Sequence, residues 1–380
     1  MRCSSTRAVL GTCGCCFASL CLLVMCLPYV LYYTTSMLRE RTFLTFVDVF
    51  TLLGWPPNPT AVQLASTFCR NDPLPATDDL SGLETLHVLY ASDANGFVGL
   101  LSSMLSVSRN LQDPSSAIIH IVVPDTDLAS AAVLVDCLKR ELADLAALPR
   151  VVLHEAKELT FDLATLDSEW IRGSRMGRLK STWVRLYLDK YLPDVPRVIY
   201  LDIDTIVTAD LAPLYRMRMQ HAVAGVWEPP LQYRACFTQK NLPIAGNVSW
   251  AFNAGVLLFD LYAFRSQGIL KEMEYWTNVT GGCWGDQLAL NLGFQGKVDH
   301  LPWAWNVKGI GGRAMMMLQL PCLSHGNVFH WTGGDGSAKQ WLPTRRKELD
   351  FLFLPYAPRE QCAALPAGSL LQQDIGRTEM

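Results

Sequence analysis

The sequence lacks any dense run of basic residues, and its formal net charge is −3 over 380 residues. Binding to nucleic acid depends on concentrated Lys and Arg side chains, so we expect no nucleic-acid partner. Fixed-period repeats and low-complexity segments are missing as well. Charged residues are scarce at 18%, whereas hydrophobic residues make up 50%, which argues against disorder and predicts a sizeable core.

Closely spaced cysteine pairs are absent from the main part of the chain. The six cysteines beyond the N-terminal region are scattered and form no Cys-x-x-Cys pair: Cys69, Cys137, Cys236, Cys283, Cys322 and Cys362. This spacing argues against a zinc module. Disulfides among these cysteines are compatible with an oxidising compartment, but the sequence does not determine their pairing.

Charged residues are also absent between positions 8 and 38, and the segment 8–33 is mostly apolar. Such a segment can cross the ~30 Å hydrocarbon layer of a bilayer. Because Arg2 and Arg7 precede it, we predict a cytosolic tail at 1–7, a signal anchor at 8–33 and a lumenal main body. The competing interpretation is a cleaved signal peptide. Sequons at Asn247 and Asn278 fit a single-pass type II protein of the Golgi or ER membrane.

The remaining chain divides into a proline-containing stem or linker at 34–84, a globular domain at 85–355 and a C-terminal tail at 356–380. Strands are predicted by apolar runs at 86–90, 117–123, 150–154, 197–207, 222–227 and 252–260. Helices are predicted by amphipathic patterns at 99–111, 128–145, 181–192, 269–278 and 286–292. Strands that alternate with helices in this way predict an α/β fold with a mostly parallel sheet flanked by helices.

The stretch 197–207 carries the strongest chemical signal. A short apolar run there leads directly into Asp202 and Asp204. Side chains at i and i+2 of a strand point to the same face, so both carboxylates are expected to converge where open α/β sheets bind ligands. Two such carboxylates repel each other unless a cation lies between them, and their oxygens suit Mg²⁺ or Mn²⁺. The alternative is a solvated acidic turn.

Four more positions carry candidate chemistry, each with a structural alternative. Asp93 and Asn95 follow the first strand and form either a nucleotide-facing loop or an ordinary turn. Arg185 could meet a pyrophosphate with its bidentate fork or form a surface ion pair. His330 follows another short apolar run, and its imidazole beside two carboxylates favours Mn²⁺ over Mg²⁺ unless it is a structural histidine.

The glycine-rich stretch after His330 is the last candidate. Gly333, with Gly334 and Gly336, allows the backbone to approach a phosphate closely, and Lys339 supplies a positive charge.

Six motifs in fixed order resemble glycosyltransferase family 8, which consists of retaining enzymes with a GT-A fold. The motifs are HVLYASDAN, VIYLDIDTIV, FNAGVLLFDL, WGDQLALN, WNVKGIGG and HWTGG followed by KQW. They extend over about 86–342, and the plant galacturonosyltransferase-like branch is the most similar in appearance. The resemblance implies a Rossmann-like nucleotide-binding sheet, a UDP-sugar donor, and a carbohydrate or glycoconjugate acceptor.

The resemblance also implies a role for each matching residue. Asp202, Asp204 and His330 are expected to bind Mn²⁺, with Mg²⁺ as the alternative ion. The residues expected to contact the donor are Asp93, Asn95, Arg185, Ile203, Asn253, Ala254, Gly333 and Lys339. Asp286 and Gln287 are expected to lie by the anomeric carbon. We hypothesise front-face attack, in which one of these two stabilises an oxocarbenium-like transition state, because an amide is a poor nucleophile.

Two departures from the family pattern stand out. Three extra residues separate Gly333 from Lys339, and Gln340 replaces a proline. Gly96 and then Phe97 follow the Asp93 turn where the family commonly has an aromatic residue, so either Phe97 stacks on the base or the stacking is lost. A glycosidase is disfavoured because its carboxylates come from separate elements. The alternative function is a weak or inactive lumenal protein of the same fold that binds nucleotide sugars or glycans.

Overall fold

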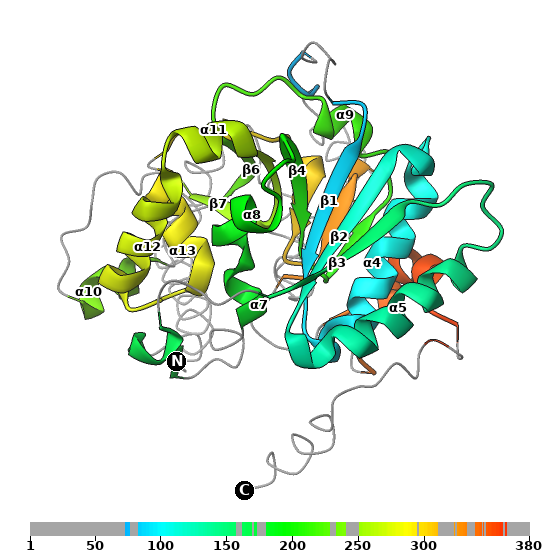
Figure 1. Ribbon diagram of the computed structural model, residues 1–380, viewed down its shortest axis with the longest axis horizontal. Coiled ribbons are helices and arrows are strands. Elements are labelled where there is room, and N and C mark those ends of the chain that lie inside the picture. The colour runs from blue at the N-terminus through cyan, green and yellow to red at the C-terminus, as the bar shows by residue number, and fades with distance from the viewer. Residues whose placement is uncertain are drawn as a thin grey trace, which may run out of the picture. The chain divides into compact units, whose positions relative to one another are not determined.

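A seven-stranded, mostly parallel sheet forms the centre of the computed structural model (Figure 1). Its strand order is β3-β2-β1-β4-β7-β6-β8. Neighbouring strands are parallel except where β7 pairs with β4 and with β6. The bounds are β1 Leu86–Ala91, β2 Ala117–Val123, β3 Arg150–Glu155, β4 Arg197–Leu201, β6 Val223–Glu228, β7 Ala251–Asp260 and β8 Asp299–His300. The predicted α/β architecture is confirmed.

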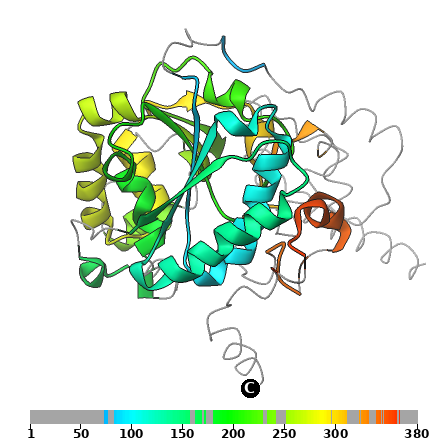
Figure 2. The same ribbon diagram turned by 45° about the vertical axis from the view of Figure 1, so that its right-hand side comes forward.

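Helices cover both faces of this sheet (Figures 1 and 2). On one face, α4 (Phe97–Asn110) and α5 (Leu128–Glu141) share a hydrophobic cluster with β1 and β2. A second cluster covers the other face and contains apolar side chains from five other helices. These are α7 Lys180–Trp183, α8 Leu188–Tyr191, α11 Leu261–Ser266, α12 Ile269–Thr280 and α13 Gly285–Phe294. Burial on both faces explains why the strands read as nearly continuous apolar runs.

The structure describes residues 73–76, 83–156, 162–168, 171–172, 180–228, 233–240, 251–294, 296–310, 325–332, 339–343 and 347–359, together with positions 323, 345 and 362. All of them belong to a compact unit that spans Asn71–Met380. The predicted anchor at 8–33, the sequon at Asn247 and the candidate residue Gly333 lie outside the described residues. In the part of the chain that is described, no helix combines the length and hydrophobicity needed to cross a bilayer.

Three predicted elements differ from those observed. The stretch 197–207 is not one strand, because β4 ends at Leu201 and β5 (Thr205–Val207) belongs to another sheet. The helix predicted at 128–145 ends at Glu141. The helix predicted at 181–192 consists of α7 and α8 joined by a 3-10 turn, Val184–Tyr187, whose tighter winding turns Arg185 into the interior.

A small three-stranded sheet brings distant parts of the chain together. Its strand order is β5-β10-β9, with β9 at Val307–Lys308 and β10 at Val328–His330. The antiparallel register of β5 and β10 places His330 opposite Thr205. Thr205 immediately follows Asp204, so this pairing delivers His330 to the acidic turn.

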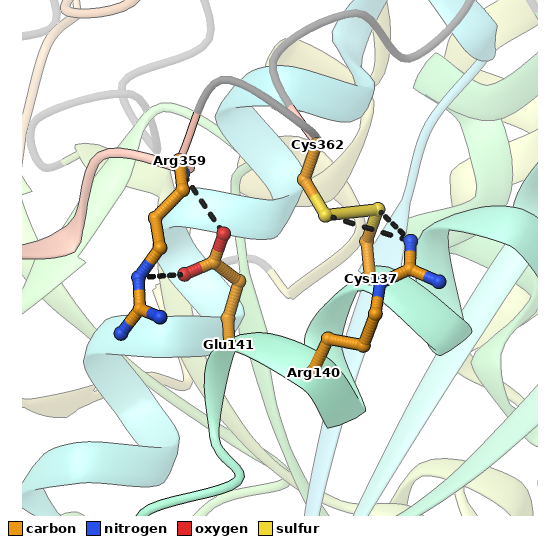
Figure 3. The surroundings of a disulfide bond; sticks show 5 residues. All are labelled: Cys137, Arg140, Glu141, Arg359 and Cys362. Atoms are coloured by element: carbon orange, nitrogen blue, oxygen red, sulfur yellow. Dashed lines mark hydrogen bonds and ion pairs between the residues drawn. A yellow bond between two sulfur atoms is a disulfide. The ribbon is translucent and has the colours of Figure 1, made fainter.

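Two disulfides join four of the six scattered cysteines. Cys137 of α5 pairs with Cys362, and Cys236 of α10 (Arg234–Gln239) pairs with Cys283. Beside the first bond, Glu141 accepts a hydrogen bond from the backbone N–H of Arg359 at 2.8 Å (Figure 3). The chain around Arg359 and Cys362 is therefore linked to α5 by a hydrogen bond and a disulfide. Disulfides persist in oxidising compartments, which supports the secretory pathway.

Candidate functional site

The acidic turn lies where β4 ends at the C-terminal edge of the main sheet. The backbone N–H of Asp202 donates to the carbonyl of Gly255 at 2.8 Å, and Thr205 N–H donates to the carbonyl of Asp202 at 3.2 Å. The two carboxylates converge through this turn and not through the strand alternation that the sequence predicted. Their shared neighbour is His330, whose Nε2 lies 3.1 Å from Asp204 Oδ1 and 3.5 Å from Asp202 Oδ2.

Gly255 leaves the space that the His330 ring occupies. A Cβ added to Gly255 would lie 1.9 Å from His330 Cε1, far inside van der Waals contact. Gly255 lies on β7, directly beside the strand that leads into the acidic turn. A glycine is therefore required here by the imidazole packed against the sheet.

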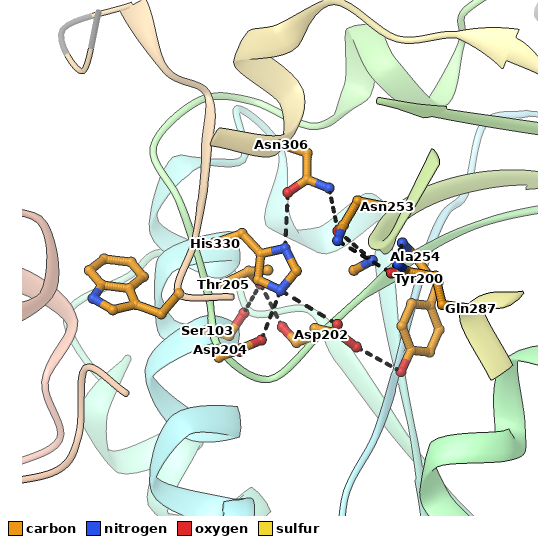
Figure 4. A network of polar contacts seen from close by, with 12 residues as sticks. Ser103, Tyr200, Asp202, Asp204, Thr205, Asn253, Ala254, Gln287, Asn306 and His330 are labelled. Carbon is orange, nitrogen blue, oxygen red and sulfur yellow. Dashed lines mark hydrogen bonds and ion pairs between the residues drawn. The ribbon is translucent and has the colours of Figure 1, made fainter. Parts of the chain in front are cut away.

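A chain of hydrogen bonds determines the tautomer of the neutral His330 ring (Figure 4). The N–H of Gly255 donates to Asn253 Oδ1 at 3.0 Å, and Asn306 Nδ2 donates to the same oxygen at 2.9 Å. This assigns the amide of Asn306, leaving its Oδ1 to accept from His330 Nδ1 at 3.0 Å. The proton of a neutral His330 thus lies on Nδ1, and the Nε2 lone pair faces the two carboxylates.

Charge interactions in this cluster outweigh the cost of burial. Burial alone would raise the pKa of Asp204, but Lys339 and His330 hold it well below its usual range. Burial lowers the pKa of His330, but the two aspartates raise it by more, so its pKa lies above the ordinary value. Lys339 forms an ion pair with Asp204 and donates to the carbonyl of Trp331 at 2.9 Å. The three extra residues before Lys339 therefore do not keep its ammonium from the cluster.

Arg185 connects the acidic turn with α13. Its Nη1 donates to Asp202 Oδ1 at 3.0 Å and to the carbonyl of Ala254 at 2.7 Å. Its Nε forms an ion pair with Asp286, and its guanidinium lies 4.8 Å from the centroid of the Tyr200 ring. The surface ion pair considered for Arg185 is wrong, because the side chain is only 10% exposed.

Asp286 and Gln287 follow Gly285, the first residue of α13, and lie in different environments. Asp286 is 3% exposed, and burial raises its pKa to about 6 although Arg185 lies beside it. Gln287 Nε2 donates to Glu228 Oε1 at 2.7 Å and to the Tyr233 hydroxyl at 2.8 Å. Gln287 Oε1 accepts from the Ala254 N–H at 3.0 Å, so the amide has one consistent orientation.

Glu228 and Asn306 were assigned no role from the sequence. Glu228 is buried at the C-terminal end of β6, where Lys308 Nζ donates to it at 3.1 Å and Tyr233 Oη at 3.2 Å. A carboxylate just after the strand predicted at 222–227 was the available signal for Glu228. Asn306 lies in the WNVKGIGG motif, which was the signal for it.

The Asp93 turn lies against the acidic turn. Asn95 Nδ2 donates to Asp93 Oδ2 at 3.1 Å, and both residues are half-buried. A Cβ on Gly96 would lie 2.3 Å from Ile203 Cδ1, which explains why no larger residue follows Asn95. Phe97 is fully buried in the core. The idea that Phe97 stacks on a base is therefore wrong, because helix α4 points its ring inward.

The donor set of the acidic cluster fits a divalent ion. Among the described residues, Asp202, Asp204 and His330 form a group whose ligand atoms all lie within 4.8 Å of one another. Two carboxylate oxygens and one imidazole nitrogen suit Mn²⁺ better than Mg²⁺, which prefers oxygen ligands.

Comparisons with known proteins agree on one family. The profile of Glycosyl transferase family 8 matches residues 87–344. The chain is 28% identical over 330 residues to Probable galacturonosyltransferase-like 7 of Arabidopsis thaliana, covering 79% of this chain and 84% of that protein. It is 26% identical over 297 residues to Probable galacturonosyltransferase-like 3 of the same plant, covering 71% of this chain and 79% of that protein.

Solved structures share the fold at low sequence identity. The galactosyltransferase LgtC, in complex with donor and acceptor sugar analogs, matches with a TM-score of 0.54 at 22% identity, covering 74% of this chain and 100% of that chain. The bifunctional glycosyltransferase WbbM matches with a TM-score of 0.57 at 17% identity. That match covers 78% of this chain and 53% of WbbM, so the chain spans about half of that protein.

Proposed function

Because the chain belongs to glycosyl transferase family 8, a family of glycosyltransferases, we propose a specific reaction for it. It transfers a hexose or a uronic acid, with retention of anomeric configuration, from a UDP-sugar to a glycan or glycoconjugate acceptor. The reaction depends on Mn²⁺ and takes place in the lumen of the Golgi or ER. The distant relationship to plant galacturonosyltransferase-like proteins makes UDP-galacturonic acid the first donor to test.

The observation that carries this proposal is the convergence of Asp202, Asp204 and His330, with His330 Nε2 facing both carboxylates. Asp202, Asp204 and His330 would hold a divalent ion there, and that ion would supply Lewis-acid stabilisation to a diphosphate leaving group. Lys339, ion-paired to Asp204, adds a second positive charge beside the same position. Such a cluster stabilises the negative charge that develops on departing UDP.

In this proposal, the donor is bound by residues that surround the metal ligands. Asp93 and Asn95 hold the nucleoside, and Ile203 lies between that turn and the metal ligands. Asn253, Ala254 and Gly333 complete the contacts to the sugar and the diphosphate. Arg185, already bonded to Asp202, orients the donor from the opposite side.

The environment of Asp286 supports front-face attack over a covalent intermediate. Its carboxylate is engaged by Arg185, and an ion-paired carboxylate is a weak nucleophile. In front-face attack, the bond from the anomeric carbon to the diphosphate oxygen breaks as the acceptor oxygen bonds to the same face. The acceptor hydroxyl proton passes to the departing phosphate oxygen. Gln287 Oε1, beside Asn253 and Ala254, stabilises the positive charge on the sugar ring.

The test is a hydrolysis panel with the lumenal part of the protein and UDP-galacturonic acid, UDP-galactose, UDP-glucose and UDP-xylose. We expect Mn²⁺-dependent UDP release from one donor, which EDTA abolishes. Asp204→Ala should abolish it as well, whereas Asp136→Ala should not, because Asp136 is an exposed residue of α5 that forms an ion pair with Lys139 of the same helix. UDP-sugar binding without turnover would instead support the inactive binding protein.

A further inference from the structure

Trp284 has an unusual backbone conformation two residues before Asp286, the first of the two residues proposed to face the anomeric carbon. Its φ is +57°, and among the described residues other than glycine it alone has a positive φ. The side chain is 37% exposed, although Trp is a large apolar residue. Left-handed φ values in bulky residues persist only where the surroundings enforce them, and they concentrate at functional sites.

The surrounding turn enforces this conformation. Gly281, Gly282 and Gly285 also have positive φ values, and the N–H of Gly285 donates to the carbonyl of Gly282 at 2.9 Å. Cys283 adjoins Trp284 and is linked to Cys236 of α10 by a disulfide. The backbone that carries the indole is therefore constrained by a hydrogen bond within the turn and by a disulfide to α10.

The indole adjoins the polar network of the site through one aromatic ring. It meets the Tyr233 ring edge-to-face, with centroids 6.2 Å apart and an interplanar angle of 87°. Tyr233 is fully buried, and its hydroxyl accepts from Gln287 Nε2 at 2.8 Å. Trp284 is thus connected through Tyr233 to the Nε2 end of Gln287. The Oε1 end of Gln287 faces Ala254 and Asn253, which are proposed to contact the donor.

We propose that Trp284 is a stacking platform for a sugar ring of the acceptor, an inference that rests on the proposed glycosyltransferase function. A pyranose ring has an apolar face of C–H groups and a polar rim of hydroxyls. A rigid indole offers a large amphipathic contact area at little conformational cost. Its contact with Tyr233, at the nitrogen end of Gln287 and not at the oxygen end that faces Ala254, assigns it to the acceptor and not to the donor.

Trp303 and Trp305, which lie close to Asn306, are both less exposed than Trp284. Trp305 is only 6% exposed and belongs to the hydrophobic core, and Trp303 packs against the cluster that contains Trp331. Trp305 is therefore a core residue. Tyr275, 57% exposed on α12 and in edge-to-face contact with Trp276, provides a matched exposed aromatic residue outside the polar network.

The experiment compares Trp284→Gly, Trp284→Phe and Tyr275→Ala with the full-length protein. The glycine variant removes the ring and accepts φ +57° without strain, so it should retain the thermal midpoint. Acceptors are benzyl glycosides of galactose, glucose, xylose and galacturonic acid, with unglycosylated Ser/Thr peptides in parallel. Each protein is assayed for transfer and for donor hydrolysis without acceptor.

We expect the glycine variant to raise the acceptor KM about tenfold, with unchanged donor KM and hydrolysis. Trp284→Phe should stay within about threefold of wild type, and Tyr275→Ala should match it. An unchanged acceptor KM in Trp284→Gly, or equal increases in both KM values, overturns the inference while leaving the transferase function intact. Wild-type transfer to peptides alone, or to no glycoside, also overturns it. Absence of donor hydrolysis in the wild type contradicts the proposed function itself.

Discussion

The Nδ1 of His330 lies 3.0 Å from the Oδ1 of Asn306, and this contact decides which imidazole nitrogen is available to a metal. The amide of Asn306 is itself oriented by Asn253, whose oxygen accepts from the backbone N–H of Gly255. A backbone group of the central sheet therefore sets the tautomer of a proposed metal ligand through two intervening amides.

Replacement of Asn306 by Leu should weaken Mn²⁺ binding. The variant removes the acceptor for His330 Nδ1 and leaves the ring orientation undetermined, which typically costs about 10- to 100-fold in metal affinity. Titration of Mn²⁺ followed by electron paramagnetic resonance measures this affinity directly. Asn110→Leu is the control, because Asn110 bonds to Val207 and Tyr356 away from the cluster. Equal Mn²⁺ affinity in Asn306→Leu and wild type would contradict the tautomer argument.

Gly255→Ala should displace the His330 imidazole, since the added Cβ would lie 1.9 Å from its Cε1. We expect loss of Mn²⁺-dependent hydrolysis and destabilisation of roughly 1–3 kcal/mol from overpacking. Hydrolysis and urea unfolding check both effects. Gly268→Ala is the control: its φ of +64° makes alanine unfavourable there, but no atom lies within 4 Å of the added Cβ. The control should lose stability and keep Mn²⁺ dependence, and the steric argument fails if the two variants behave alike.

Glu228→Gln should lower turnover more than donor binding. Glu228 positions Gln287 through the 2.7 Å bond to Nε2 and neutralises Lys308, and a misplacement of about 1 Å can cost up to about 100-fold in rate. Steady-state kinetics should show a reduced kcat with a donor Kd within about twofold of wild type. Glu141→Gln is the matched control, because Glu141 is also buried and paired with an arginine. A kcat equal to that of Glu141→Gln would exclude the positioning role.

Acid should destabilise the fold through histidines on three adjacent strands. His120 Nε2 lies 3.0 Å from His87 Nδ1, and His120 Nδ1 lies 2.9 Å from His154 Nε2. Burial, with Arg150, lowers the pKa of His87 to about 4, and burial, with the other two histidines and Arg150, lowers that of His120 to about 3. Both values lie below the ordinary 6.5, so the unfolded chain binds protons that the folded chain excludes.

This stability is complete above about pH 6.5 and decreases as the pH falls towards 4 and then 3. For His120 alone, the expected loss between pH 7 and pH 5 is about 2 kcal/mol. Urea unfolding at the two pH values measures it. Asp286, whose pKa is raised to about 6, contributes in the opposite direction, so comparison with His120→Gln isolates the histidine effect. An equal pH dependence in His120→Gln and wild type would refute this assignment.

The correct and incorrect predictions share a physical explanation. Apolar runs that end in polar residues marked β1 and β4 and placed their chemistry at one edge of the sheet, because parallel strands buried on both faces have that pattern. Strand β7 is antiparallel to β4 and brings Asn253 and Ala254 to the same edge near its beginning. The same pattern led to a predicted strand at 197–207 that is longer than the observed β4, which ends at Leu201. The apolar run Thr205–Val207 looks like a continuation of β4, and only its pairing with β10 identifies it as a separate strand.

The sequence alone determined the fold class, the family and the chemical types of the candidate site, because these depend on local patterns and motif order. The tertiary structure alone decided how the residues meet: Asn306 beside His330, Glu228 beneath Gln287, Phe97 in the core, and Trp284 outward on a disulfide-linked turn. Such relationships join residues from distant segments, and hydrogen-bond geometry and close packing between segments leave no periodic signal in a single chain.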